Sequence, residues 1–534
     1  MGPRVSTHAN VHASFIKGVA YQQDYAGNGT TSSTGEGYTD PLADTAACQR
    51  DIPYISRLGM NAIRVYAIDP TQNHDTCMNA LADAGIYVIA DLSAPVQGLA
   101  INRDSPDWDD ELYARYASVI DALAPYSNTL GFFAGNEVSN QPNNTNAAPF
   151  VKAAVRDMKK YISDAGYRPM GVGYATDDNQ YVRENIVDFF NCGDPADAID
   201  FWGYNIYSWC GDSTYQESGY ADRTAQFETF SVPSFFAEYG CNTLGTRTFS
   251  EVGALYGPQM SKVFSGGIVY MYFQEANNYG ISAHFHTMLN TLTYLPGLVN
   301  VDGDSVQTLE DYDNLQSQLG RVRPSGVQLD SYNPTNSPAA CPTVQTNWSA
   351  EATPLPPTPN KELCVCMYSS LQCTVSGRTN PDDYEDLFGT VCGLDEKACA
   401  GIEYNGTTGA YGAYGMCNAT EQLGFAFNQY FRNNDQAASA CDFDGAARTM
   451  EARDVGATCT SLMQQAGAQG TGTVTAQPSG TGAGAAAGGG SGGGAASSSQ
   501  MAGPRLVASV QAGVLPVLGM VGVALFSGAG MILL

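Results

Sequence analysis

Positive charge is scarce in this chain of 534 residues. Lys and Arg number 25 against 53 Asp and Glu, which gives a formal net charge of -28 at pH 7. A chain this acidic repels polyanions, so the balance argues against nucleic acid as a partner. The same acidity suits a neutral polysaccharide partner and suits plain solubility equally well.

Histidine is also rare, with five residues in the whole chain. None of them lies in the cysteine-dense stretch 361–459, which weakens a zinc interpretation of Cys364 and Cys366. His284 and His286 form a pair without a nearby Cys or a spaced third His. We therefore expect no metal site and no organic cofactor.

An apolar leader is missing from the start of the sequence. Residues 1–14 lack the apolar core of a signal peptide, and residues 1–6 formally fit an N-myristoylation pattern. Myristoylation implies a protein of the cytosol, and the cysteines argue against that location. The 14 Cys divide into six up to Cys341 and eight from Cys364 to Cys459. Even counts of this kind indicate disulfides and a secretory route. We expect the true start, with its signal peptide, to lie upstream.

Glycosylation signals agree with the secretory route. An Asn in the pattern N-x-S/T is the acceptor for an N-linked glycan, and such sites lie on the surface of secreted proteins. The sequence contains five of them, at Asn28, Asn143, Asn347, Asn405 and Asn418.

Charge is absent from the end of the chain after Arg505. Residues 480–499 are almost wholly Gly, Ala and Ser, typical of a flexible tether, and 514–534 form an apolar tail. Small residues, a short polar spacer and an apolar tail are the signal for a glycosylphosphatidylinositol (GPI) anchor, although a tail-anchored membrane helix is an alternative. We expect the protein at the cell surface, anchored to the outer leaflet of the plasma membrane and possibly the cell wall. The candidate attachment residues are Ser497, Ser498 and Ser499.

The chain is too long to fold around one ordinary hydrophobic core, so we expect several domains. Short apolar runs alternate with helical stretches over the first 300 residues, and Gly59, Gly85 and Gly166 end three of those stretches. Eight strands separated by helices predict an α/β fold, the (β/α)8 TIM barrel, whose active site lies at the C-terminal strand ends. The runs are 15–22, 62–68, 87–92, 129–137, 170–175, 200–207, 232–240 and 267–274.

A change of composition marks the end of the barrel. The segment 350–360, AEATPLPPTPN, is Pro-rich, and eight Cys follow within about 100 residues, which predicts a small disulfide-rich α+β module. A disordered Gly/Ala/Ser-rich tail follows the module. The expected divisions are a catalytic domain 15–345, a linker 346–360, a cysteine-rich module 361–460, a tether 461–500 and an anchor propeptide 501–534.

Two glutamates end apolar runs of the predicted barrel. TLGFF at 129–133 leads to Glu137 at the end of the fourth strand, and VPSFF at 232–236 leads to Glu238 at the end of the seventh. A single such Glu is more often a salt-bridged strand end, because an unpaired buried carboxylate is costly. Two carboxylates in one pocket can cleave a glycosidic bond, with retention when they lie roughly 5 Å apart. We therefore predict a sugar-active enzyme.

Polar neighbours fit this chemistry. Asn136 precedes Glu137 and is well placed to bond a sugar 2-OH. Tyr207 and Tyr239 lie near strand ends, where they could hold the nucleophile or stack on a sugar face.

Several motifs, taken together, resemble one known family. FIKGVAYQ, NAIRVYAID, ADLS, FFAGNEV, ATDDNQYVRENI, GYNIYSWCG, FFAEYGCN and GGIVYMYFQEANNYG occur in order over residues 15–345. The sequence is similar here to fungal glycoside hydrolase family 72, the cell-wall β-1,3-glucanosyltransferases, which are retaining enzymes on a (β/α)8 barrel.

The resemblance implies roles for individual residues. Glu137 would be the acid/base and Glu238 the nucleophile, with Glu275 as the chief rival for the second carboxylate. For Asp178 and Arg183 the alternative to sugar binding is a local surface ion pair. The residues implied to line the glucan cleft are Tyr66, Asp91, Ser93 with the rest of 93–101, Asn136, Asp178, Arg183, Tyr207 and Tyr270.

The cysteine-rich module resembles the carbohydrate-binding module of family 43. The matching runs are LCVC at 363–366, YGAYGMC at 411–417 and CDF at 441–443. Sequence alone leaves 105 pairings open for eight cysteines. The resemblance implies Cys364–Cys417, Cys366–Cys459, Cys373–Cys441 and Cys392–Cys399 in the module, and Cys48–Cys77, Cys192–Cys341 and Cys210–Cys241 in the barrel.

The function expected from these features is a monomeric, GPI-anchored 1,3-β-glucanosyltransferase with β-1,3-glucan as donor and acceptor. The nearest alternative is an endo-β-1,3-glucanase, which shares the first half-reaction. A non-catalytic glucan-binding wall protein is a further alternative, but a retired active site has no need of both Glu137 and Glu238.

Overall fold

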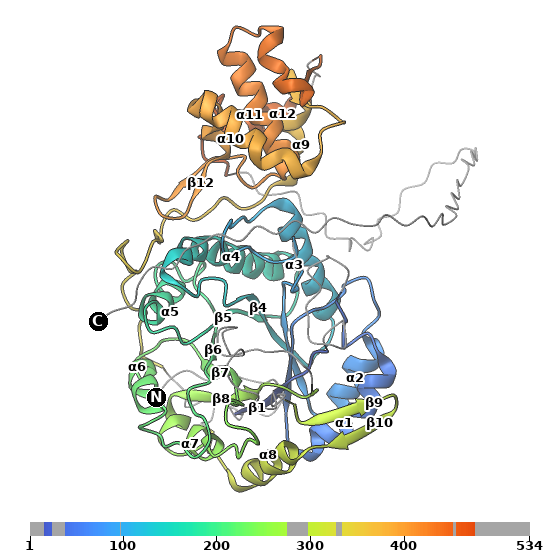
Figure 1. Ribbon diagram of the computed structural model, residues 1–534, viewed down its shortest axis with the longest axis vertical. Helices are drawn as coiled ribbons and strands as arrows, with labels where there is room; N and C mark the ends of the chain where they lie inside the picture. Colours follow the sequence, from blue (N-terminus) through green and yellow to red (C-terminus); the bar gives the residue numbers. More distant parts are fainter. Residues whose placement is uncertain are drawn as a thin grey trace, which may run out of the picture. The chain divides into compact units, whose positions relative to one another are not determined.

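A computed structural model describes residues 15–23, 38–96, 98–274, 297–326, 334–451 and 455–475. Eight parallel strands, paired in sequence order, close into a barrel (Figure 1). The predicted (β/α)8 fold is therefore confirmed. The strands are β1 (Ile16–Ala20), β2 (Ala62–Val65), β3 (Tyr87–Asp91), β4 (Thr129–Asn136), β5 (Gly171–Thr176), β6 (Trp202–Asn205), β7 (Ser234–Tyr239) and β8 (Phe264–Val269).

Helices surround the strands (Figure 1). Gly59, Gly85 and Gly166 have φ values of 73°, 73° and 71°, the left-handed conformation that ends a helix and suits glycine. The barrel's helices are α1 (Thr45–Arg57), α2 (Asp75–Asp83), α3 (Asp110–Leu123), η1 (Pro142–Ala147), α4 (Ala148–Asp164), α5 (Arg183–Asn191), α6 (Tyr220–Phe227), α7 (Glu251–Leu255), η2 (Met260–Lys262) and α8 (Glu310–Arg321).

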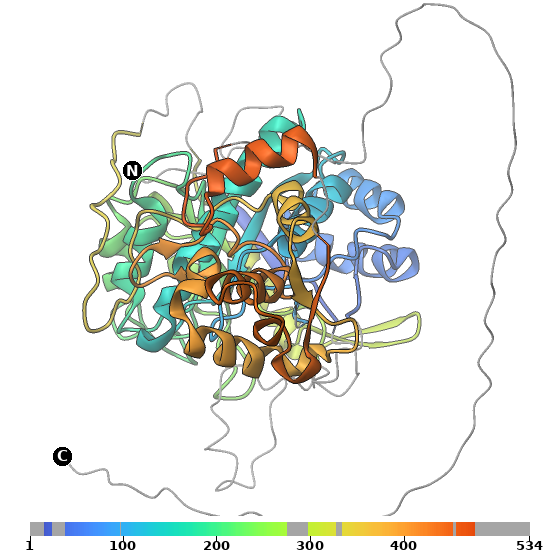
Figure 2. The same ribbon diagram turned by 90° about the horizontal axis from the view of Figure 1, so that it is seen from above.

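A hairpin of β9 (Val299–Asp302) and β10 (Ser305–Thr308) extends beside α1 and α2 (Figures 1 and 2). Arg50 of α1 donates a hydrogen bond to the carbonyl of Gly303 in its turn, 2.8 Å away. This contact ties the hairpin to the helix layer.

The eighth strand lies earlier in the sequence than predicted. It covers Phe264–Val269 rather than 267–274. Phe264 is buried, and its ring lies 5.0 Å from Phe236 and 5.3 Å from Phe227. This aromatic packing begins the strand three residues before Gly267, the predicted start.

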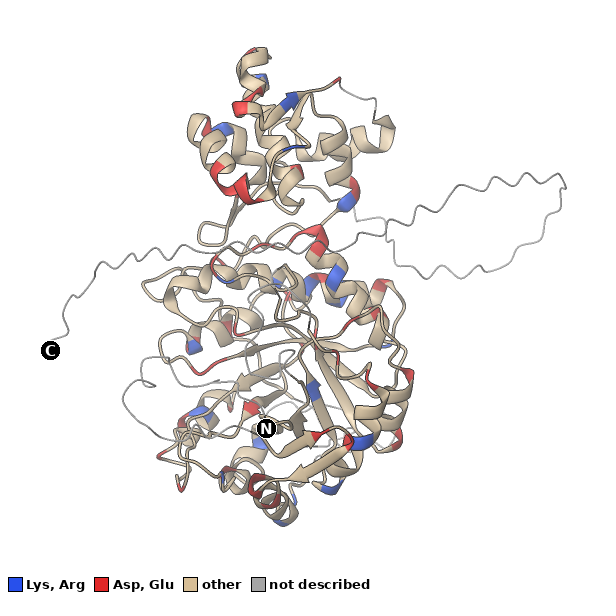
Figure 3. Cartoon of the chain, turned by 45° about the vertical axis from the view of Figure 1, so that its right-hand side comes forward, with Lys and Arg blue, Asp and Glu red and all other residues tan. Residues whose placement is uncertain are grey.

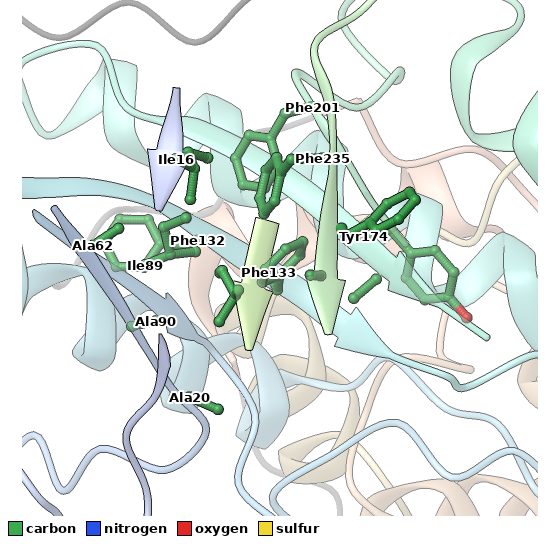
Figure 4. Packing of buried hydrophobic residues seen from close by; sticks show 14 of the residues in the cluster. Ile16, Ala20, Ala62, Ile89, Ala90, Phe132, Phe133, Tyr174, Phe201 and Phe235 are labelled. Carbon is green, nitrogen blue, oxygen red and sulfur yellow. The ribbon is translucent and has the colours of Figure 1, made fainter. Parts of the chain in front are cut away.

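Aromatic side chains fill the barrel interior below the C-terminal strand ends. The ring of Phe133 lies 5.2 Å from Phe201 and 6.0 Å from Phe235, and the three side chains face one another (Figure 4). Gly203 leaves room for them, since a Cβ there would lie 2.7 Å from the Phe133 ring. These rings form a rigid floor for the polar site above.

The segment expected to be a free linker belongs partly to the barrel. Trp348 and Ala350 are fully buried in the barrel's core, and the Trp348 ring lies 5.2 Å from Phe189. Burying so large an apolar side chain fixes Trp348 to the barrel, where the Pro-rich composition suggested only a semi-rigid spacer. The expected domain end at 345 is therefore too early.

The cysteine-rich module has its own core, and it continues past the expected end at 460. Helix α12 covers Gly456–Ala466, with Leu462 and Ala466 buried, and Gln429 donates to the carbonyl of Ala468. Because this helix packs on the module's core, the tether begins later in the sequence than predicted. The other elements of the module are α9 (Lys361–Ser369), β11 (Cys373–Val375), η4 (Pro381–Asp383), α10 (Tyr384–Leu394), η5 (Glu396–Ile402), β12 (Tyr404–Asn405), β13 (Ala410–Tyr411), α11 (Ala419–Asn433), η6 (Ala438–Cys441), η7 (Phe443–Gly445) and β14 (Ala447–Thr449).

Seven disulfides join the pairs that the resemblance implied. Four of them lie in the module, where the small core needs covalent support. The bonds are Cys48–Cys77, Cys192–Cys341, Cys210–Cys241, Cys364–Cys417, Cys366–Cys459, Cys373–Cys441 and Cys392–Cys399.

Surface features bear on the remaining expectations. Acidic residues are spread over the helices and loops seen in Figure 3, as the composition requires. Asn143 is exposed, whereas Asn347, Asn405 and Asn418 are half-buried. Among the described residues, no helix has the length and apolarity to cross a membrane. The predictions for Asn28, Glu275, His284, His286 and Ser497, Ser498 and Ser499 lie outside the described residues.

Candidate active site

Irregular strand pairing brings the two key carboxylates to the barrel's C-terminal end. On β7 the register shifts so that Tyr204 pairs with Phe236 but Asn205 pairs with Glu238, which leaves Ala237 as an extra residue. Side chains alternate along a regular strand, and a bulge of this kind re-aims the next one. Phe235 can therefore fill the interior while Glu238, three residues later, also faces inward.

Glu238 is buried and held by three donors. The Tyr66 hydroxyl donates to Oε1 at 2.9 Å, and the Tyr207 hydroxyl donates to Oε2 at 2.7 Å. Arg64 Nη1 also donates to Oε1, at 3.2 Å. With both oxygens engaged from opposite sides, the carboxylate has one fixed orientation, as a nucleophile requires.

The pKa of Glu238 reflects competing influences. Burial raises it, to about 7, and the negative charge of Glu137 adds to the rise. Arg64 and the two tyrosine hydrogen bonds oppose that rise, because they favour the ionised form. The site therefore keeps a buried carboxylate available as an anion near neutral pH.

Arg64 organises the site from below. It is fully buried, and its guanidinium binds both oxygens of Asp91, at 3.0 and 2.9 Å, as well as Asn136 Oδ1 at 2.9 Å. The guanidinium lies 4.5 Å from the centre of the Phe133 ring, on the aromatic floor. Burial alone would lower the pKa of Arg64, but Asp91, Tyr66 and Glu238 raise it, so the group stays charged.

Glu137 follows the end of β4 in an uncommon backbone conformation. Its φ is 52°, in the left-handed region that non-glycine residues rarely occupy. Alternation would send Asn136 and Glu137 to opposite faces, and this turn lets both reach one site. Asn205 Nδ2 donates to Glu137 Oε1 at 2.8 Å.

The two carboxylates are neighbours. Asn205, whose amide bonds Glu137, is the residue paired with Glu238 across β6 and β7. Asn205 thus contacts Glu137 through its side chain and adjoins Glu238 through its backbone. The charge of Glu137 also raises the pKa of Glu238, so the two carboxylates lie close together, as the acid and the nucleophile of a retaining glycosidase do.

Two family models match this sequence. The glucanosyltransferase model, glycoside hydrolase family 72, matches residues 4–294, and the X8 domain model matches residues 371–448, inside the cysteine-rich module. The chain belongs to the glucanosyltransferase family.

Curated relatives agree with the glucanosyltransferase model. A 1,3-beta-glucanosyltransferase of Arthroderma benhamiae is 50% identical over 524 residues, which cover 97% of this chain and 90% of the relative. The 1,3-beta-glucanosyltransferase gas1 of Schizosaccharomyces pombe is 43% identical over 463 residues, with coverage of 86% and 80%.

Solved glucanosyltransferase structures are also similar. Saccharomyces cerevisiae Gas2p in complex with laminaritriose and laminaritetraose has a TM-score of 0.71 and 39% identity, covering 84% of this chain and 97% of that one. A Gas2p mutant in complex with laminaritetraose and laminaripentaose has the same TM-score, 38% identity, and coverage of 84% and 94%.

The structure gathers several residues that the glucanosyltransferase resemblance named around Glu238. The Tyr270 ring lies edge-on to Tyr66, at 6.3 Å, and to Tyr207, at 6.5 Å, so the three form an aromatic wall. Asn136 accepts hydrogen bonds from Arg64 and Asn205 through its carbonyl oxygen. Its amide nitrogen is thereby turned away from both, free to donate to a sugar hydroxyl.

Other predicted residues have less direct positions. Asp91 is buried with both oxygens on Arg64, so it holds Arg64 rather than offering an oxygen to a sugar. Ser93 is half-buried. Asp178 accepts a hydrogen bond from Arg183 at 2.9 Å and another from Tyr204, so the local ion pair exists whether or not sugar binds.

Tyr239 does not hold the nucleophile. It is buried outside the carboxylate pair and bonds to Tyr256, because the residue after an inward-facing Glu238 points to the opposite side of its strand. The prediction that Tyr239 could serve the nucleophile or stack on sugar was wrong, and Tyr207 alone of that pair reaches Glu238.

Sequence reasoning missed four polar residues of the site: Arg64, Arg103, Asp177 and Asn205. Arg64 carried a usable signal, since a cation inside a buried strand requires a partner. Asn205 likewise ends an apolar strand. Arg103 and Asp177 lie in loops, where polar residues are ordinary, so no local pattern distinguishes them.

Proposed function

We propose that this chain is a 1,3-β-glucanosyltransferase that cleaves β-1,3-glucan internally and joins the new reducing end to the non-reducing end of another glucan. The observation that carries the proposal is the fixed, three-donor cradle of Glu238 beside Glu137. Family membership and the laminari-oligosaccharides bound by Gas2p support β-1,3-glucan as donor and acceptor.

In the first half-reaction Glu238 attacks the anomeric carbon. As the bond to the carboxylate oxygen forms, the glycosidic bond breaks and Glu137 gives its proton to the departing oxygen. Tyr66 and Tyr207 keep Glu238 aligned for this attack. The Asn136 amide is positioned to bind the sugar 2-OH, a contact that strengthens in the transition state.

In the second half-reaction Glu137 acts as a base. It takes the proton from the acceptor's hydroxyl, the new glycosidic bond forms, and the ester to Glu238 breaks. The same steps with water as acceptor describe an endo-β-1,3-glucanase, the alternative function. The aromatic wall of Tyr66, Tyr207 and Tyr270 favours a sugar over water, because carbohydrate faces stack on aromatic rings.

Incubation with a laminari-oligosaccharide reduced at its end tests the proposal. Transfer gives products longer than the substrate together with shorter ones, whereas hydrolysis gives only shorter ones. Chromatography and mass spectrometry read the lengths, and the Glu238→Gln variant serves as the blank. Only shorter products from the unaltered protein would establish the glucanase.

Removal of the Tyr207 hydroxyl is expected to change the pH dependence of cleavage. Its hydrogen bond favours ionised Glu238, so Tyr207→Phe raises the pKa of that carboxyl further. The acidic limb of kcat/KM then moves to higher pH, by about one unit for a charge-assisted bond. An unchanged or lowered limb contradicts this assignment. Tyr161→Phe, which removes a tyrosine–carboxylate bond to Asp121 in the helix layer, is the matched control.

We also propose that the uncharged C-terminal tail anchors the protein to the cell surface as a GPI signal. A chain ended after residue 475 keeps α12 and should be secreted as active enzyme. Full-length protein should move from membranes to the soluble fraction on treatment with a phosphatidylinositol-specific phospholipase. Resistance to that enzyme, with membrane attachment intact, favours the tail-anchored helix instead.

A further inference from the structure

The acid/base Glu137 needs outside support for its backbone. A left-handed φ of 52° is strained for a glutamate, and such conformations persist where surrounding bonds hold them. Its N–H donates to the carbonyl of Ala175 on β5 at 2.8 Å. Its own carbonyl accepts a hydrogen bond from Arg103 Nη2, also at 2.8 Å. One strand and one loop thus hold this residue from its two sides.

Arg103 comes from the loop between β3 and α3 and is half-buried. Its charge also affects Asp177, which directly follows β5. Burial, together with the charges of Glu137 and Asp178, raises the pKa of Asp177 to about 7, and Arg103 opposes that rise. Asp177 Oδ1 is buried without a hydrogen-bond partner among the described residues. Glu137, Asp177 and Arg103 are therefore close enough for their charges to act on one another.

The nearby cations are already engaged elsewhere. Arg64 binds Asp91 and Glu238, and Arg183 binds Asp178. Arg103 makes no ion pair with a described residue, and its guanidinium donates to the carbonyl of Glu137. Among the described arginines nearby, Arg103 is therefore the one whose positive charge is available to Glu137 and Asp177.

We propose that Arg103 is a positioning residue for the acid/base. It holds Glu137 in its left-handed conformation and balances the negative charge that Glu137 acquires when its proton moves to the departing oxygen. In the second half-reaction the acceptor's proton returns to Glu137, and Arg103 undergoes no covalent change. This inference rests on the proposed function only through its first step, retaining cleavage with Glu137 as acid, and not on transfer to sugar.

Substrates that differ in their need for an acid give the decisive test. A laminari-oligosaccharide has a poor leaving group, whereas a laminaribiosyl fluoride releases fluoride without help from an acid. We expect Arg103→Met to slow oligosaccharide cleavage about 100-fold, because small misplacements of a catalytic group cost that much. First-turnover fluoride release should fall less than threefold. Azide, which needs no base, should restore turnover of the fluoride substrate.

Two further variants and a control complete the design. Arg103→Lys keeps the charge and should cleave the oligosaccharide about tenfold faster than Arg103→Met. Arg103→Gln keeps polarity alone and should be no faster than Arg103→Met. The matched control is Arg115→Met on α3, which removes an arginine-to-carbonyl bond to Ile68 at 2.6 Å, away from the carboxylates, and should leave both rates within twofold. Thermal unfolding midpoints check that each variant is folded. If Arg103→Met does not fold, the two substrates are compared in Arg103→Lys and Arg103→Gln instead.

Equal losses on both substrates, or no loss on the oligosaccharide, would overturn the assignment. The outcome is separate from that of the transferase proposal. If the unaltered protein only hydrolyses its substrate, the transferase proposal fails while the leaving-group comparison keeps its meaning.

Discussion

Replacing the nucleophile, Glu238→Gln, is expected to reduce both cleavage and transfer by a factor of about 10⁵. The substitution keeps the size of the side chain but removes the oxygen that bonds to the anomeric carbon. With the amide oxygen in the place of Oε1, Tyr66 and Arg64 can still donate to it, and the Tyr207 hydroxyl can accept from the amide nitrogen in the place of Oε2, so the geometry of the pocket is preserved. The loss therefore reports chemistry rather than misfolding.

Covalent trapping of the glycosyl intermediate tests the same assignment independently. A 2-deoxy-2-fluoro laminaribiosyl fluoride should add one glycosyl mass to the unaltered protein, on the peptide that contains Glu238. Glu251→Gln is the matched control, because Glu251 is equally buried, with a pKa also raised by burial to about 7, but lies on α7 and makes no bond to Glu238. Activity within tenfold of normal in Glu238→Gln, or a label on another residue, would show that the nucleophile lies elsewhere.

Loss of the buried cation, Arg64→Met, is expected to reduce both stability and activity. Asp91 would keep a buried charge without its partner, which lowers the free energy of unfolding by about 3–5 kcal/mol. Glu238 and Asn136 would each lose a hydrogen bond from below, so we also expect kcat/KM to fall by about 10³, the loss seen when a preorganised donor is removed. Urea unfolding measures the first effect and oligosaccharide cleavage the second.

A double-mutant cycle separates these two roles of Arg64. The Arg64→Met, Asp91→Leu double variant removes the unpaired charge of Asp91 and should regain part of the stability without regaining activity. Lys160→Met provides the control, since the exposed Lys160–Asp164 pair contributes less than about 1 kcal/mol. A double variant no more stable than Arg64→Met would mean that Asp91 is not the group destabilised by its loss.

Prediction from sequence succeeded where one pattern determined one element. Apolar runs of strand length, separated by helices ending in glycine, could be assigned to a barrel because strand and helix periodicities differ. The same pattern located Glu137 and Glu238 at strand ends. Buried packing set the remaining boundaries: Phe264 begins β8 early, Trp348 extends the barrel's core, and α12 extends the module.

The geometry of the site was less predictable because it depends on departures from regular pairing. Strict alternation cannot place both Phe235 and Glu238 inside the barrel, and the extra residue in β7 that permits this leaves no mark in the sequence. Alternation likewise assigned Tyr239 no fixed role, and only the structure shows it bonded to Tyr256. Arg103 reaches Glu137 from a distant loop, a contact that local sequence does not encode.

The asparagine that bonds Glu137 and lies beside Glu238 in the sheet has a consequence for how such enzymes can diversify. Asn205 is carried by a strand, and backbone hydrogen bonding holds neighbouring strands about 4.8 Å apart. Asn205 and Glu238 thus belong to paired strands of the barrel wall, and apart from the β3–α3 loop, which carries Arg103, the loops do not hold either carboxylate in place. Mutation in those loops is free to alter which sugar chains are accepted and how long the products grow. The stereochemical outcome at the anomeric carbon stays insulated from that variation.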